Sequence, residues 1–129
     1  MSFPARTPRA RPQGGGWDLA IWYLMRLTGV GLFVLALSHF LITHVVYDPA
    51  EQTAQWIIDE RWANITWRTI DWLMLTLVVF HGFMGMRNVV LDYTRGGLRL
   101  LLTMSLYGTG IVLFLLGTIA VLNAPAPIP

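Results

Sequence analysis

The sequence predicts an all-α integral membrane protein built as a bundle of three transmembrane helices. Hydrophobic residues make up 55% of the 129 residues and charged residues only 12%, which is about half the charged share of a soluble domain. The apolar residues form three runs, and we expect helices over about residues 19–47, 69–93 and 98–122. Each has the roughly 20 residues that a helix needs to cross a bilayer. A soluble helical bundle would need a polar face on each run, and these runs have none.

The charged residues predict the orientation of the chain. All the basic residues are arginines, and most lie before the first helix, inside its start, or around the turn between the second and third helices. The positive-inside rule therefore places the N-terminus and this turn in the cytoplasm and the C-terminus outside. The arginine-rich start is too short and too interrupted by Pro and Gly to predict a nucleic-acid partner. The absence of cysteine excludes disulfides, iron–sulfur ligation and thiol catalysis in this chain.

The segments outside the helices divide the chain into three parts. Residues 1–16 are rich in Arg, Pro and Gly and predict a flexible cytoplasmic arm. Residues 17–123 form the anchor domain, in which residues 51–62 predict a short amphipathic segment on the outer membrane surface. Asp71, near the start of the second helix, is expected to pair with Arg68 or to stabilise the helix N-terminus. Residues 124–129 are a Pro-rich tail.

The first helix carries one arginine and two histidines within its apolar run. Arg26 lies about one turn inside the predicted interface, where a basic side chain can snorkel to the surface. Gly29 and Gly31 favour close contact with another helix. His39 and His44 are five residues apart, hence about 140° apart around a helix, so they should not both face one ligand. His44 is interpreted as an interfacial residue, whereas His39 lies deeper.

A short row of polar residues lies along one side of the second helix. Gly85, Asn88 and Asp92 fall within roughly 40° of His81 at about 100° per residue. A row of an imidazole, a glycine, an amide and a carboxylate is a poor surface for lipid and should face protein or a ligand. Asp92 and Tyr93 lie roughly 16–18 Å beyond His81 along the axis, near the membrane surface.

These residue types are compatible with redox chemistry in a membrane. A neutral imidazole at mid-membrane suits an axial position on haem iron, and Gly85, one turn later, leaves room for a flat macrocycle. Arg87 is within reach of a haem propionate or a lipid phosphate. From the residues alone, Asp92 could equally be a helix-end carboxylate paired with a nearby arginine, and Tyr93 a tyrosine of the interfacial belt.

The pattern His81-x3-Gly85-x-Arg87-x4-Asp92-Tyr93 resembles the membrane-anchor cytochrome b subunits of succinate dehydrogenase (respiratory complex II, succinate:quinone oxidoreductase). It is most like the smaller of the two anchor subunits in that family, although the larger anchor has a related pattern. Residues 25–30 of the first helix and residues 61–64 of the loop are also similar, and the resemblance covers roughly residues 20–123.

The resemblance implies a role for each candidate site residue. In that family, the histidine on the second helix ligates haem b and the Asp-Tyr pair borders the quinone site. The quinone-site residues would therefore be Tyr93, Asp92 and Arg26. The haem residues would be His81 as axial ligand, Arg87 as a propionate contact and His39 as the ligand of a second haem.

The resemblance also implies the partners. A large anchor subunit would supply the second axial ligand, while a flavoprotein with FAD and an iron–sulfur subunit would dock on the cytoplasmic face of the inner membrane. Electrons from succinate would then reach menaquinone or ubiquinone, and whole complexes could assemble as trimers. Two alternatives stay open from sequence: the anchor of a quinol:fumarate reductase, and a purely structural membrane anchor without haem.

Overall fold

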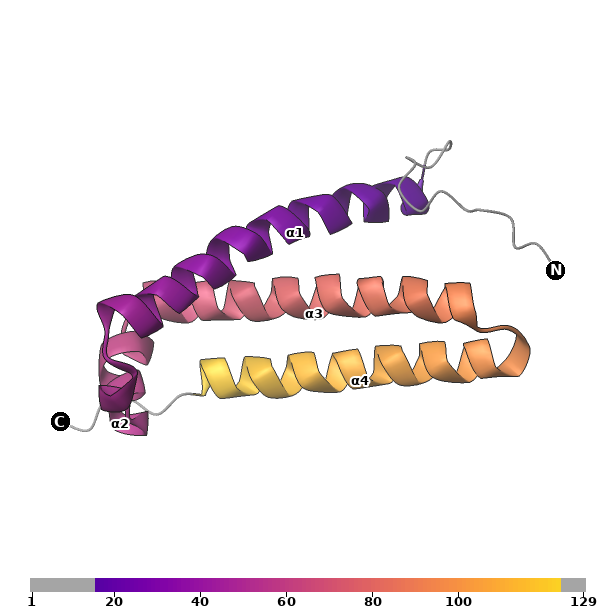
Figure 1. Cartoon of the computed structure of the whole chain (residues 1–129). Coiled ribbons are helices and arrows are strands. Elements are labelled where there is room, and N and C mark those ends of the chain that lie inside the picture. Colours follow the sequence, from indigo (N-terminus) through magenta and orange to yellow (C-terminus); the bar gives the residue numbers. More distant parts are fainter. Residues whose placement is uncertain (1–15, 124–129) are drawn as a thin grey trace.

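Three long helices form the body of the protein in a computed structural model, which describes residues 16–123. These are α1 (Trp17–Leu41), α3 (Ile65–Tyr93) and α4 (Gly96–Leu122). Helix α3 lies between α1 and α4, and α1 runs at a slant to α3 (Figure 1). We call the end where α1 begins and α3 joins α4 the turn end, and the opposite end the loop end. The arm and the tail predicted at 1–16 and 124–129 lie outside the described residues, except for Gly16.

All three long helices are apolar and long enough to cross a membrane, over Trp17–Val46, Ile65–Tyr93 and Gly96–Leu122. Every regular element within residues 16–123 is helical, which confirms the predicted all-α class with three spanning helices. Helix α3 begins four residues before the predicted start. Asn64 explains this, because its side chain accepts a hydrogen bond from the backbone N–H of Thr66 at 2.8 Å and so caps the helix.

The loop end consists of short helical turns instead of one continuous surface helix. A π-helical turn, η1 (Ile42–Val46), continues α1, and it is followed by η2 (Pro49–Glu51), α2 (Ala54–Trp56) and the π-helical η3 (Ile57–Trp62). The side chains of Asp48 and Thr53 cap η2 and α2 by accepting backbone N–H bonds. The chain thereby folds back over the end of the bundle before α3 begins (Figure 1).

Glycines set the distance between neighbouring helices. A Cβ added at Gly31 would stand 3.2 Å from Leu77 of α3, and one added at Gly117 of α4 would stand 2.7 Å from Leu75 of α3. Such close approach is typical of helix packing in membranes, where small residues let backbones come near each other. This agrees with the close helix contact expected from Gly29 and Gly31 of the first span.

The turn between α3 and α4 is held by Arg99. Its guanidinium donates to the carbonyl oxygen of Leu91 at 2.9 Å and to that of Thr94 at 2.8 and 2.6 Å. These carbonyls belong to the end of α3, where the last turn leaves carbonyl oxygens without intrahelical partners. Gly96 opens α4 with a φ of 60°, a left-handed conformation that favours glycine.

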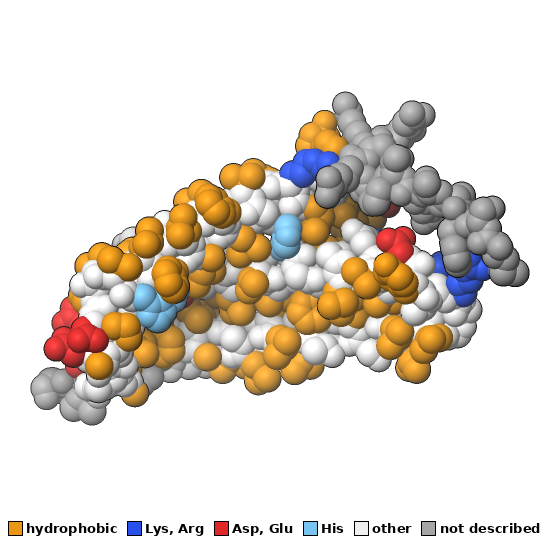
Figure 2. All heavy atoms as spheres, viewed as in Figure 1, with side chains coloured by type: hydrophobic (Ala, Val, Ile, Leu, Met, Phe, Trp, Pro, Cys, Tyr) orange, Lys and Arg blue, Asp and Glu red, His pale blue; other side chains and the backbone are white. Residues whose placement is uncertain are grey.

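Apolar side chains cover much of the surface, as Figure 2 shows over all three helices. Among the described residues, Val121 is the one buried hydrophobic side chain. Three polar side chains are buried, namely Thr28, Thr43 and Arg61. This distribution, with polar side chains buried and apolar side chains exposed, is expected of a chain that is surrounded by lipid or by other apolar helices.

Candidate functional site

His81 lies near the middle of α3 and faces α1. Its Nδ1 is 3.1 Å from the hydroxyl oxygen of Thr28, and the imidazole is partly buried between the two helices. The hydroxyl also lies 2.7 Å from the carbonyl oxygen of Leu24, one turn back on α1. Thr28 is only 6% exposed, so its hydroxyl contacts protein groups.

Two glycines shape the space around this imidazole. A Cβ added at Gly29 of α1 would stand 3.2 Å from Cε1 of His81, so the ring edge rests against the α1 backbone. At Gly85, one turn after His81, an added Cβ would meet only Met25, at 3.9 Å. Gly85 therefore leaves the helix surface beside His81 without a side chain of its own, and the flexible end of Met25 is the neighbour there.

The residues predicted for a quinone site lie toward the turn end. Tyr93, the last residue of α3, is 86% exposed, and Asp92 is exposed beside it. Arg26 is exposed on α1, and its guanidinium lies 3.4 Å from the ring centroid of Trp22 and donates to the Trp22 carbonyl at 3.3 Å. Arg26 is thus folded back along its own helix by cation–π and hydrogen-bond contacts. Arg87 is half-buried on α3.

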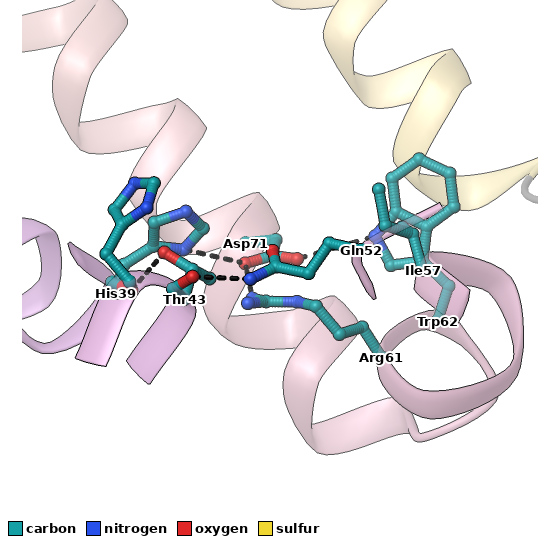
Figure 3. A pocket seen from close by; sticks show the side chains of 8 residues that line it. His39, Thr43, Gln52, Ile57, Arg61, Trp62 and Asp71 are labelled. Carbon is teal, nitrogen blue, oxygen red and sulfur yellow. Dashed lines mark hydrogen bonds and ion pairs between the residues drawn. The ribbon is translucent and has the colours of Figure 1, made fainter. Parts of the chain in front are cut away.

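A second polar cluster lies at the loop end, and we call it the Asp71 cluster: His39, Arg61, Trp62 and Asp71. Figure 3 shows these side chains converging from α1, η3 and α3. Arg61 Nη2 is 2.7 Å from Asp71 Oδ1, Trp62 Nε1 is 3.4 Å from Oδ2, and His39 Nδ1 is 3.7 Å from Oδ1. The cluster borders a pocket of about 330 Å³.

One expectation about this end needs correction. Asp71 pairs with Arg61, whereas Arg68 donates to the carbonyl oxygen of Trp62 at 2.5 Å. His39 and His44 both border this pocket, His39 from α1 and His44 from the π-helical turn Ile42–Val46. That the two histidines do not both face one ligand stays a prediction.

Sequence reasoning missed two features of these sites. It did not find Thr28 as the partner of His81, because a pattern on one helix does not reveal what the neighbouring helix presents. It also missed the Asp71 cluster, although a carboxylate inside a predicted span is itself a signal that a buried partner exists. The loop that supplies Arg61 and Trp62 has no periodicity from which their position could be read.

Comparison with known proteins decides the family. Residues 10–124 match the family model described as succinate dehydrogenase/fumarate reductase transmembrane subunit. The chain belongs to this family. Over 78 residues, this transmembrane subunit is 33% identical to the succinate dehydrogenase hydrophobic membrane anchor subunit of Archaeoglobus fulgidus. That alignment covers 60% of this chain and 64% of the relative, so the chain spans less than two thirds of the relative's length.

The match confirms the resemblance inferred from the His81–Tyr93 pattern. The chain is a membrane-anchor subunit of the succinate dehydrogenase/fumarate reductase family, and its three apolar helices are the spans that such an anchor needs. His81 and Tyr93 both lie within the region that the family model matches.

Proposed function

We propose that this subunit anchors a succinate:quinone oxidoreductase, binds one haem b through His81 and forms part of the quinone-reduction site at the turn end. The observation that carries the haem proposal is the setting of His81 in mid-span. Its Nδ1 is engaged by Thr28 at 3.1 Å, which leaves Nε2 for iron, and Gly85 one turn later has no side chain to obstruct a flat ligand. When bound, a haem supplies a one-electron redox couple whose potential depends on its axial ligands and burial.

The residues of this chain that would serve the haem are few. His81 supplies one axial nitrogen, so the second must come from another chain, which we take to be the large anchor subunit. Arg87, two residues after Gly85 on α3, has the charge to neutralise a propionate. The hydrogen bond at Nδ1 orients the imidazole, as the outer partners of metal-bound histidines do.

The turn end suits a quinone and its protons. The hydroxyl of Tyr93 can donate a hydrogen bond to a quinone carbonyl oxygen, and this bond strengthens as negative charge develops on that oxygen. Asp92 beside it can take protons from the aqueous side and pass them on. Arg26 adds positive potential once its guanidinium leaves Trp22, with which it now stacks.

The partners and the location follow from the family and the arginine distribution. The cytoplasmic side would be the turn end, where Arg95 and Arg99 lie. There an iron–sulfur subunit would deliver electrons taken from succinate by the FAD of a flavoprotein subunit. The same anchor would serve a quinol:fumarate reductase with the electron flow reversed. Assembly into trimers, and the choice between menaquinone and ubiquinone, stay predictions.

His39 is the candidate ligand of a second haem, toward the loop end. Its Nδ1 lies 3.7 Å from the carboxylate of Asp71, an arrangement that leaves Nε2 for a metal, as in carboxylate–histidine–metal triads. The pocket beside it is about 330 Å³. We take one haem, held by His81, as the proposal and a second haem at His39 as the alternative.

Haem counting in the purified complex tests this function. A pyridine haemochrome assay should give one b-type haem per complex in the unchanged protein and none in a His81→Leu variant. His39→Leu and His44→Leu should keep that haem, and the second is the matched control because His44 is exposed. Full haem content in His81→Leu would remove the ligand assignment and return the chain to a structural anchor. Two haems, with one lost in His39→Leu, would establish the second site.

A further inference from the structure

We propose that Thr28 is the positioning residue of His81: its hydroxyl holds the imidazole in the tautomer that carries its proton on Nδ1 and presents the Nε2 lone pair. This inference rests on the proposed haem function. It assigns the positioning of the His81 imidazole to α1, whereas the His81–Tyr93 pattern concerns α3 alone. The ligand would then be built by two helices, α3 providing the nitrogen and α1 deciding which nitrogen is available.

The hydrogen-bond geometry supports this direction of donation. A threonine hydroxyl has a single proton and two lone pairs. Thr28 Oγ1 is 2.7 Å from the carbonyl oxygen of Leu24 and 3.3 Å from that of Met25. Carbonyl oxygens only accept, so the short contact to Leu24 uses the hydroxyl proton. The 3.1 Å contact with His81 Nδ1 is then satisfied when Nδ1 carries a hydrogen and donates it.

Burial of Thr28 favours this hydrogen-bond arrangement. Thr28 is only 6% exposed, so water does not compete for its hydroxyl, and an unsatisfied polar atom there would cost about 1–3 kcal/mol. The opposite tautomer would place a bare Nδ1 lone pair against an oxygen lone pair. It would also put the ring proton on Nε2, where it blocks binding to iron.

Gly29, the next residue of α1, fixes the orientation of the ring. An added Cβ there would stand 3.2 Å from Cε1 and 3.8 Å from Nδ1 of His81. The ring edge therefore lies close to the α1 backbone, in space that a side chain at position 29 would fill. Thr28 and Gly29 together form a seat for the Nδ1–Cε1 edge of the imidazole.

The seat has consequences that can be measured at the iron. Donation from Nδ1–H raises the basicity of the ligating nitrogen, which favours ferric over ferrous iron. Loss of the Thr28 hydroxyl, which accepts this hydrogen bond, should therefore raise the reduction potential of the haem. It should also weaken haem binding, by about 10- to 100-fold when an orienting partner of a ligating histidine is removed.

The test uses variants of the whole complex, purified in detergent. Thr28→Val removes the hydroxyl at nearly constant shape, and Thr28→Ser keeps it. Thr76→Val is the matched control, because Thr76 makes the same one-turn-back bond, to the Trp72 carbonyl at 2.9 Å, on α3. Haem is counted by pyridine haemochrome after washing with a haem-scavenging apoprotein, and its midpoint potential is measured by redox titration.

We expect faster haem loss and a raised midpoint potential in Thr28→Val, and values near those of the unchanged complex in Thr28→Ser and Thr76→Val. Should Thr28→Val not assemble, Thr28→Ala removes the same hydroxyl and replaces it in the comparison. The proposal would be overturned if Thr28→Val retained haem as well as Thr28→Ser does and had the same midpoint potential. Retention of haem in His81→Leu would instead overturn the haem function itself, so the two failures are distinguishable.

The Gly29 half of the seat has its own comparison. Gly29→Ala should displace the ring and change the electron paramagnetic resonance spectrum of the ferric haem, which is sensitive to axial ligand orientation. Gly82→Ala is the control, since a Cβ added at Gly82 meets nothing within 4 Å. Identical spectra for the two variants would contradict the role of Gly29.

Discussion

The guanidinium of Arg61 lies 2.7 Å from the carboxylate of Asp71, and both side chains are largely shielded, with exposed fractions of 9% and 14%. This ion pair joins η3 to the first turns of α3. Trp62 and His39 complete its surroundings from η3 and α1 (Figure 3). The loop end is therefore fixed to the bundle by charge, whereas the helices are held to each other by the close approach of small residues.

Removing the carboxylate should destabilise the loop end. Asp71→Asn leaves the buried guanidinium of Arg61 without its counter-charge, which typically costs about 3–5 kcal/mol. We expect a lower thermal denaturation midpoint for the purified complex, followed by fluorescence-detected size exclusion. Asp59→Asn is the control, because Asp59 is exposed and accepts only from Gln55. Equal midpoints for the two variants would show that the pair contributes nothing.

Gly117 and Gly108 of α4 offer a matched steric test. Ala in place of Gly gains about 1 kcal/mol of helix propensity at either site. At Gly117 the new Cβ would stand 2.7 Å from Leu75, while at Gly108 it meets nothing within 4 Å. Overpacking costs about 1–3 kcal/mol, so Gly117→Ala should be less stable than Gly108→Ala in the same denaturation assay. The reverse order would mean that Leu75 moves away without cost.

Tyr93→Phe should separate the two activities of the complex. Loss of the hydroxyl removes the proposed hydrogen bond to the quinone, while the proposed dicarboxylate chemistry would proceed in a partner subunit. We expect quinone reduction to fall about 100- to 1,000-fold, in line with the loss of one oxyanion donor, with succinate oxidation by an artificial dye unchanged. Parallel loss of both activities would contradict the assignment. Tyr23→Phe, on α1, is the comparison variant.

The orientation can be tested with single thiols, because the sequence contains no cysteine. The two variants are Arg95→Cys, at a position between α3 and α4 at the turn end, and Glu51→Cys, at a position in η2 at the loop end. In sealed right-side-out vesicles, a membrane-impermeant maleimide should label the second variant and spare the first until the membrane is opened. The opposite pattern would place the turn end outside.

The features that sequence predicted are those that depend on composition and on position along one helix. Three apolar runs were enough to predict the three spans, and the spacing from His81 to Tyr93 was enough to indicate the family. The contacts of His81 with Thr28 and of Asp71 with Arg61 were not predicted. They depend on how α1 is rotated against α3 and on π-helical turns in the loop, neither of which leaves a periodic signal in one sequence.

The scarcity of buried apolar side chains among the described residues has a consequence for the life of the subunit in the cell. With little interior of its own, the isolated chain gains little free energy from association of its helices. Copies made in excess of their partners would remain loosely packed, with polar groups such as His81 within reach of lipid. Because loosely packed chains are open to proteolysis in cells, the number of lasting copies of this anchor would follow the number of its partner subunits.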